Sequence, residues 1–159
     1  MKTPLVALGC LLLVVCPVRG EGETDTNAVA ATVRGFLIGA MTMEMEEVEK
    51  HALPHPDLKL LSEGQAPPIP VKRQMREAVG RAVCTFFAEG EEVRLPGGRT
   101  ITVSAAAVSP GRCLVRPVIG GSPMPVPLAV IRTDAGWKVD ATPLIEARKS
   151  AAKQRQAAG

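Results

Sequence analysis

Two histidines and two acidic residues form a group whose spacing could suit a metal ion. His51 and His55 are four residues apart, Glu47 lies one helical turn before His51, and Asp57 follows His55 closely. On a continuous helix the two histidines would share a face and could bind zinc together with a carboxylate. However, a proline flanks His55 on each side, which predicts that the helix ends between the histidines. We therefore expect solvent-exposed histidines at a helix end, with no bound metal and no cofactor.

Three closely spaced methionines raise a second metal hypothesis, because thioether sulfurs bind soft ions such as copper(I). Met41, Met43 and Met45 follow one another at intervals of two residues. That spacing distributes the side chains over different faces of a helix, so their sulfurs would not converge. We expect Met41 to pack in the core and Met43 and Met45 to be more exposed.

Asp140, Glu146 and Arg116 are the side chains that could take part in acid–base chemistry within a pocket. None of them lies in a motif that marks a catalytic group, and the chain has no tyrosine to serve as a hydroxyl donor. The sequence therefore predicts no catalytic residue. Arg116 and Asp140, together with Trp137, are instead our candidates for a ligand-binding site.

The first 20 residues have the pattern of a secretory signal. Lys2 precedes an apolar run from Leu5 to Val15, and a proline and Gly20 follow it. The run is about half of the ~20 residues that a membrane-spanning helix needs, so we expect cleavage after Gly20. The sequence thus predicts a secreted or periplasmic protein that begins at Glu21 and keeps no stable membrane span.

Two of the four cysteines, Cys84 and Cys113, lie beyond the predicted signal peptide of residues 1–20. An even number of cysteines in an oxidising compartment is compatible with a disulfide bond. Apolar residues flank both cysteines, and free thiols also pack well in an apolar core. A Cys84–Cys113 disulfide and two separate buried thiols therefore both remain open.

The exported chain is almost electrically neutral. Lys2 and Arg19 are two of the 19 basic residues, which leaves 17 basic residues against 16 acidic ones. Nucleic-acid interfaces usually combine a basic stripe with aromatic residues, whereas here the basic residues are scattered and aromatic residues make up 3% of the chain. We expect no nucleic-acid partner. The identity of a ligand or protein partner remains open, and so does a homodimer.

The hydrophobic pattern changes from a helical period to a strand period along the chain. Gly35 and Gly39 interrupt the first helical stretch and would let another element approach it closely. We expect an α+β fold, in which N-terminal helices pack on a curved antiparallel sheet of about five strands and a short C-terminal helix follows. The expected segments are helices over 26–50 and 71–81, a helical turn at 57–61, a hairpin over 93–103, strands over 112–119, 128–133 and 137–141, and a helix from 142; residues 21–150 would form one domain and 151–159 a frayed basic tail.

Trp137 is the only tryptophan, and it follows a tight turn at residues 134–136. An indole beside such a turn can cover the end of a sheet, so we expect it to cap the core. Stacking of the ring on a ligand is the alternative.

The segment DAGWKVD, with the long helical stretch AVAATVRGFLIGAM and a run of strands before it, resembles secreted bacterial members of the NTF2-like (cystatin-like) superfamily. The matched positions are Asp134 and 136–140. The resemblance implies a curved sheet that wraps a helix around a cone-shaped cavity. Because the superfamily includes isomerases, cyclases, dehydratases and many members without activity, the fold does not supply a function. We expect a binding or assembly module at the cell envelope, and the alternative is an isomerase-like or cyclase-like enzyme that uses such a cavity.

Overall fold

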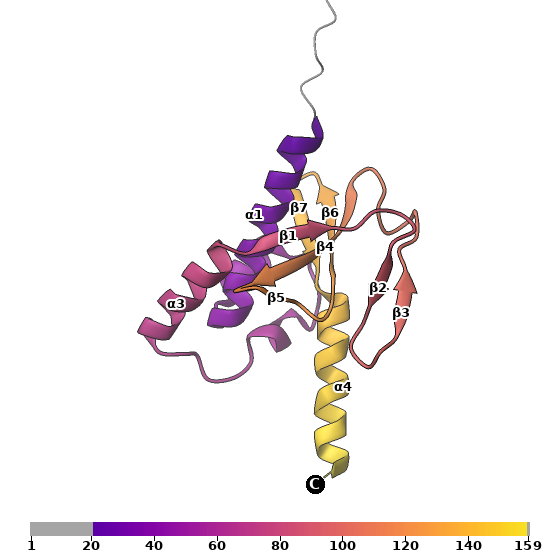
Figure 1. Ribbon diagram of the computed structural model, residues 1–159. Helices are drawn as coiled ribbons and strands as arrows, with labels where there is room; N and C mark the ends of the chain where they lie inside the picture. The colour runs from indigo at the N-terminus through magenta and orange to yellow at the C-terminus, as the bar shows by residue number, and fades with distance from the viewer. Residues whose placement is uncertain (1–20, 159) are drawn as a thin grey trace, which may run out of the picture.

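The computed structural model describes residues 21–158 (Figure 1). The predicted signal peptide of residues 1–20, with Cys10 and Cys16, lies outside the described residues. Helices come first and strands follow, so the expected α+β class is confirmed. The elements are α1 (Glu21–Thr42), α2 (Met45–His51), the 3-10 helix η1 (Leu58–Ser62), α3 (Ile69–Gly80), β1 (Val83–Phe86), β2 (Glu92–Arg94), β3 (Thr100–Thr102), β4 (Arg112–Ile119), β5 (Ser122–Pro123), β6 (Leu128–Thr133), β7 (Gly136–Asp140) and α4 (Thr142–Ala158).

The main sheet is antiparallel and has five strands. Its order is β1-β4-β6-β7, and the short strand β5 pairs with β4. The expected hairpin forms β2 and β3, but these two strands make a separate sheet instead of joining the main one. The reason is that β1 pairs directly with β4, with Phe86 opposite Val115, and leaves the hairpin outside that pair. In Figure 1 the hairpin stands to the right of the main sheet.

The expected single helix over 26–50 is wrong, because the chain turns back on itself in the middle. Met43 adopts a left-handed conformation with φ 58°, which ends α1 and allows α2 to fold against it. A Cβ at Gly39 would lie 2.7 Å from the backbone nitrogen of Val48, and one at Gly35 would lie 2.3 Å from Nε2 of His51. At Gly39 the nearest atom belongs to the backbone of α2, so α2 can lie this close only because this residue is glycine. At Gly35 the nearest atoms belong to the His51 ring, which a larger residue would displace. The expectation that these glycines admit another element is confirmed.

The core lies between α1 and one face of the main sheet. Val29, Val33 and Phe36 of α1 are completely buried. They belong to one cluster with inward-facing residues of the central strands, including Val115 and Val139. Because residues two apart on a strand share a face, the same side of the sheet also presents Cys84, Cys113 and Trp137, and all three pack against the cluster.

The edge of the sheet at β7 is covered by the chain that leaves α2. Ala52 forms a parallel bridge with Val139, and the amide of Leu53 donates to the carbonyl of Val139 over 2.9 Å. Lys138 also donates to the carbonyl of Lys50 near the end of α2. These contacts fix the α1–α2 hairpin to the last strand and protect a backbone edge that would otherwise be exposed.

The last helix, α4, is longer than expected. The sequence predicts a frayed tail over 151–159, whereas α4 continues through Ala158. Its first turn is held by Ile145, which is completely buried, and beyond that turn the helix extends away from the sheet toward the C-terminus (Figure 1). No helix within residues 21–158 is long and apolar enough to cross a membrane.

Candidate functional site

The three candidate ligand-binding residues lie on different faces of the sheet. Trp137 shares a face with Val139, where it is partly buried and packs against the core. The guanidinium of Arg132, opposite it on β6, lies 6.0 Å from the ring centroid. Arg116 and Asp140 occupy the alternate positions of their strands and therefore point from the other face. The structure does not bring these three residues together, and it places Trp137 where a core-capping residue would be.

Arg116 and Asp140 make local structural contacts instead. Arg116 donates to the carbonyl of Arg94 over 3.2 Å, and its guanidinium lies 5.2 Å from the ring centroid of Phe87. The hydrogen bond to Arg94 joins the β2–β3 hairpin to the main sheet. Asp140 accepts a 3.1 Å hydrogen bond from the amide of Thr142, which satisfies a free donor in the first turn of α4.

Cys84 and Cys113 are both free thiols, so the structure has the separate thiols and not the disulfide. They share a face, but Cys84 is opposite Pro117, four residues along β4 from Cys113. At about 3.3 Å per residue, this offset separates them by roughly 13 Å, whereas a disulfide needs Cα atoms within about 7 Å. Burial raises the pKa of both thiols, which keeps them protonated and weakly nucleophilic.

The two histidines make separate contacts and do not form a metal site. His51 packs over Gly35 and pairs with Glu47, with 3.6 Å between Nε2 and the carboxylate. Its side chain is only 22% exposed, so the expectation of a solvent-exposed histidine is wrong for His51. Burial lowers its pKa. His55 accepts a 3.1 Å hydrogen bond from the amide of Asp57 through Nδ1. Within the described part of the chain, no group of three His, Cys, Asp or Glu side chains could hold a metal ion.

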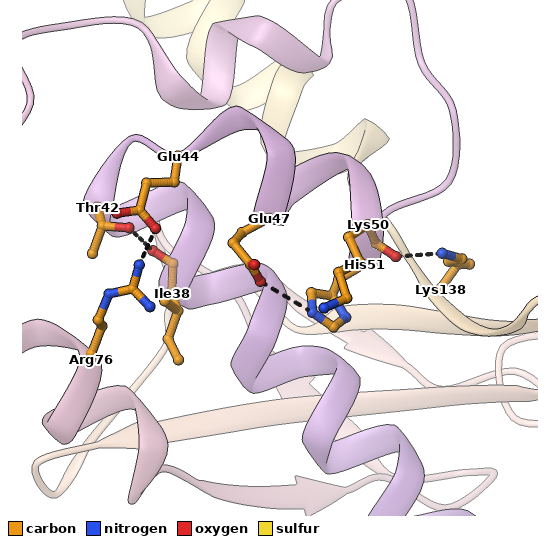
Figure 2. Close-up of polar contacts among 8 residues, drawn as sticks. All are labelled: Ile38, Thr42, Glu44, Glu47, Lys50, His51, Arg76 and Lys138. Carbon is orange, nitrogen blue, oxygen red and sulfur yellow. Dashed lines mark hydrogen bonds and ion pairs between the residues drawn. The ribbon is translucent and has the colours of Figure 1, made fainter.

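The turn between α1 and α2 is tied to α3 by an ionic cluster (Figure 2). Glu44 accepts a hydrogen bond from Arg76 and lies 3.6 Å from Nζ of Lys72. The hydrogen bond from Arg76 is the main reason why the pKa of Glu44 is lowered. Thr42 is fully buried and donates to the carbonyl of Ile38 over 2.7 Å. The cluster fixes the end of α1 relative to α3, and both helices form walls of the cavity described next.

An apolar groove with a volume of about 650 Å³ lies among the described residues. Its walls come from helices α1, η1, α3 and α4, from the end of β4 and from the loop before β6. Among the described residues that line it, Arg148 is the only charged one, and the others are apolar. The groove is lined by Phe36, Leu37, Ala40, Met41, Met43, Leu61, Met75, Ile119, Met124, Pro125, Val126, Leu144, Ala147, Arg148 and Ala151.

Four methionines from separate segments converge on this groove. Met41 comes from the end of α1, Met43 from the turn that follows it, Met75 from α3, and Met124 from the loop after β5. A Cβ at Gly64 would lie 3.0 Å from Cε of Met43, so the loop after η1 passes close to that side chain. The expectation that Met41 packs in the core and that Met43 and Met45 are more exposed is wrong, because Met41 is 37% exposed and Met45 packs against the core. The groove was missed because its lining residues come from distant parts of the chain.

The chain matches no protein-family model, and no curated protein or solved structure is significantly similar to it. The fold and the groove are therefore the basis for a functional conclusion.

Proposed function

We propose that this protein is an exported binding module of the cell envelope and that the groove holds the apolar part of its ligand. The observation that supports this function best is the lining, which is apolar except for Arg148. A volume of about 650 Å³ is in the range of small-molecule sites, which cover roughly 300–1,000 Å³. Each CH₂ group of a ligand that leaves water for such a lining contributes about 0.8 kcal/mol.

The methionines favour a ligand that is flexible or variable in shape. Methionine has an unbranched side chain and a polarizable sulfur, so it adapts to irregular apolar surfaces. With Met41, Met75 and Met124 on three different walls, the lining can adjust from several sides at once. A lining of rigid aromatic or β-branched residues would instead select one shape.

An NTF2-like enzyme is the alternative, and the α+β arrangement of helices on a mostly antiparallel sheet is compatible with that architecture. Acid–base catalysis on a small molecule needs a carboxylate, imidazole or comparable group directed at the substrate. The described groove lining offers none of these, since its single polar side chain is the guanidinium of Arg148. This lining favours binding over catalysis.

The groove can be tested with Nile red, a neutral dye that fluoresces in apolar sites. We expect saturable binding to the wild-type protein and an affinity at least tenfold lower in Ala147→Trp, because the indole would fill the groove. Ala157→Trp is the matched control, since it adds the same ring to an exposed position of the same helix outside the lining. Equal binding by wild type and Ala147→Trp, with both folded by circular dichroism, would refute a ligand site in the groove.

The predicted export is tested separately by N-terminal sequencing of the protein from the producing cell. The expected first residue is Glu21. A mature protein that retains residues 1–20 would contradict the localisation and leave the groove proposal unaffected.

A further inference from the structure

A second cavity adjoins the apolar groove and has a more strongly charged lining. Its volume is about 500 Å³, and it lies between the end of η1 and the middle of α4. Arg148 and Ala151 line both the cavity and the groove, so the two spaces meet along α4. The cavity is lined by Leu60, Glu63, Arg148, Lys149, Ala151, Ala152 and Arg155.

The positive charges of this cavity are only partly neutralised. Lys149 lies 2.8 Å from a carboxylate oxygen of Asp57 and 3.1 Å from one of Glu146, so its charge is already compensated. Arg148 uses Nη1 to donate to the carbonyl of Leu60 over 2.7 Å, which positions the guanidinium without neutralising it.

Two arginines therefore remain available for an anion. Within the described residues neither Arg148 nor Arg155 has a carboxylate within ion-pair distance, and Glu63 is the only acidic residue in the cavity lining. Both guanidinium groups therefore lie where the apolar groove ends without a carboxylate partner in the described chain, whereas Lys149 has two.

We propose that the groove and the cavity together bind one free single-chain amphiphile with an anionic head. The hydrocarbon chain occupies the groove, and a carboxylate or phosphate head lies between Arg148 and Arg155. A guanidinium donates in a planar fork that matches both head groups, which makes arginine suited to this position. This inference rests on the proposed function, because it assigns a ligand class to the same groove.

The shape of the site favours a single molecule over a membrane surface. The groove is concave and walled by α1, α3 and α4, so a flat bilayer could reach only its rim. A volume of about 650 Å³ for the apolar part also suits one small ligand. An amphipathic helix with acidic flanks is the competing occupant of an apolar groove, and the experiment distinguishes it.

The test compares dodecanoate with dodecanol, which have the same chain and differ in the charge of the head. Both would displace Nile red from the protein, and we expect dodecanoate to bind about tenfold more tightly. Arg155→Gln should reduce that preference severalfold and leave Nile red and dodecanol affinities unchanged, and Arg148→Gln should reduce the preference as well. Among the described residues Arg155 forms no hydrogen bond or ion pair, so its variant removes charge without disturbing η1. Lys153→Gln is the matched control, because it removes one charge from the same helix outside both linings.

Equal affinities for dodecanoate and dodecanol would overturn the inference. It would also be overturned if Lys153→Gln weakened the preference for dodecanoate as much as Arg155→Gln does. A membrane-binding surface would be indicated if the protein bound phosphatidylglycerol vesicles equally well with and without Ala147→Trp and bound dodecanoate weakly. That result would also overturn the inference. Failure to bind dodecanoate together with tight binding of an acidic amphipathic peptide would assign the groove to a helix. If the wild-type protein does not bind Nile red, the proposed function is refuted. If it binds Nile red but does not prefer dodecanoate over dodecanol, only this inference is refuted.

Discussion

Gly39→Ala tests whether α2 folds against α1 as described. The new Cβ would lie 2.7 Å from the backbone nitrogen of Val48 and 2.9 Å from Cβ of Glu47. Because the nearest atom belongs to the backbone of α2, relief requires the whole helix to move. Overpacking of this kind costs about 1–3 kcal/mol.

The magnitude follows from two opposing effects. Alanine is favoured over glycine inside a helix by about 1 kcal/mol, which offsets part of the overpacking. We expect a net loss of up to about 2 kcal/mol in the free energy of unfolding. At roughly 3 °C per kcal/mol for a domain of this size, Tm should fall by up to about 6 °C in thermal unfolding followed by circular dichroism.

Gly80→Ala is the matched control for the same substitution. Gly80 is the last residue of α3, and a Cβ there would meet nothing within 4 Å. Only the gain in helix propensity remains, so Tm should stay constant or rise by up to about 3 °C. If Gly39→Ala were as stable as Gly80→Ala, the close contact between α1 and α2 would be refuted.

Three further predictions concern residues that the sequence singles out. Burial lowers the pKa of His51, so the unfolded chain binds a proton at His51 more readily than the folded chain does. The free energy of unfolding should therefore decrease as pH falls below about 6.5. His51→Gln should weaken this pH dependence, as measured by urea unfolding between pH 5 and 7. A pH dependence that is the same in both proteins would contradict this origin. Trp137→Ala should lower the free energy of unfolding by about 2 kcal/mol, as measured by chemical denaturation. This is less than the ~3–5 kcal/mol lost with a fully buried ring, because Trp137 is only partly buried. A loss near zero would show that the ring does not cap the core. Titration in denaturant of protein that lacks residues 1–20 and was purified without reductant should find two free thiols, Cys84 and Cys113, and finding none would contradict the strand register.

The strands were predictable because their signals are local. Alternating apolar residues bounded by turns predict strands over 112–119 and 128–133, and β4 and β6 have these bounds. The predicted helix at 71–81 corresponds to α3 with a shift of two residues at its start and one at its end. In these segments local propensity and the final packing favour the same conformation.

The break in the first helix could not be predicted in the same way. Residues 26–50 keep a helical hydrophobic pattern across Met43, and glutamate and methionine are good helix formers. The chain turns there because α2 gains a close contact with the glycine positions of α1, and this is a tertiary effect. The partial burial of His51 has the same cause, since it occupies the space that a side chain at position 35 would fill.

The candidate site was only partly accessible from the sequence. From the sequence, Trp137 and Asp140 are candidates for one site. They are three residues apart, and an odd offset on one strand places two residues on opposite faces, so this grouping is wrong. The groove is different, because its lining extends from Phe36 to Ala151 and converges only after the helices pack on the sheet. The four methionines that reach it share no periodic pattern in the sequence.

The pairing of the α1–α2 hairpin with β7 has a consequence for the order in which the chain folds. Lys138 donates to the carbonyl of Lys50, 88 residues earlier, and Ala52 bridges Val139 beside it. Contacts so distant in sequence require closure of a long loop and therefore form slowly. During synthesis from the N-terminus, α1 and α2 can assemble early, but the apolar surface that they direct at β7 stays uncovered until the last strand has emerged. A fragment that ends before β7 should therefore aggregate or be bound by chaperones, and the protein acquires its stable core only when almost the whole chain is present.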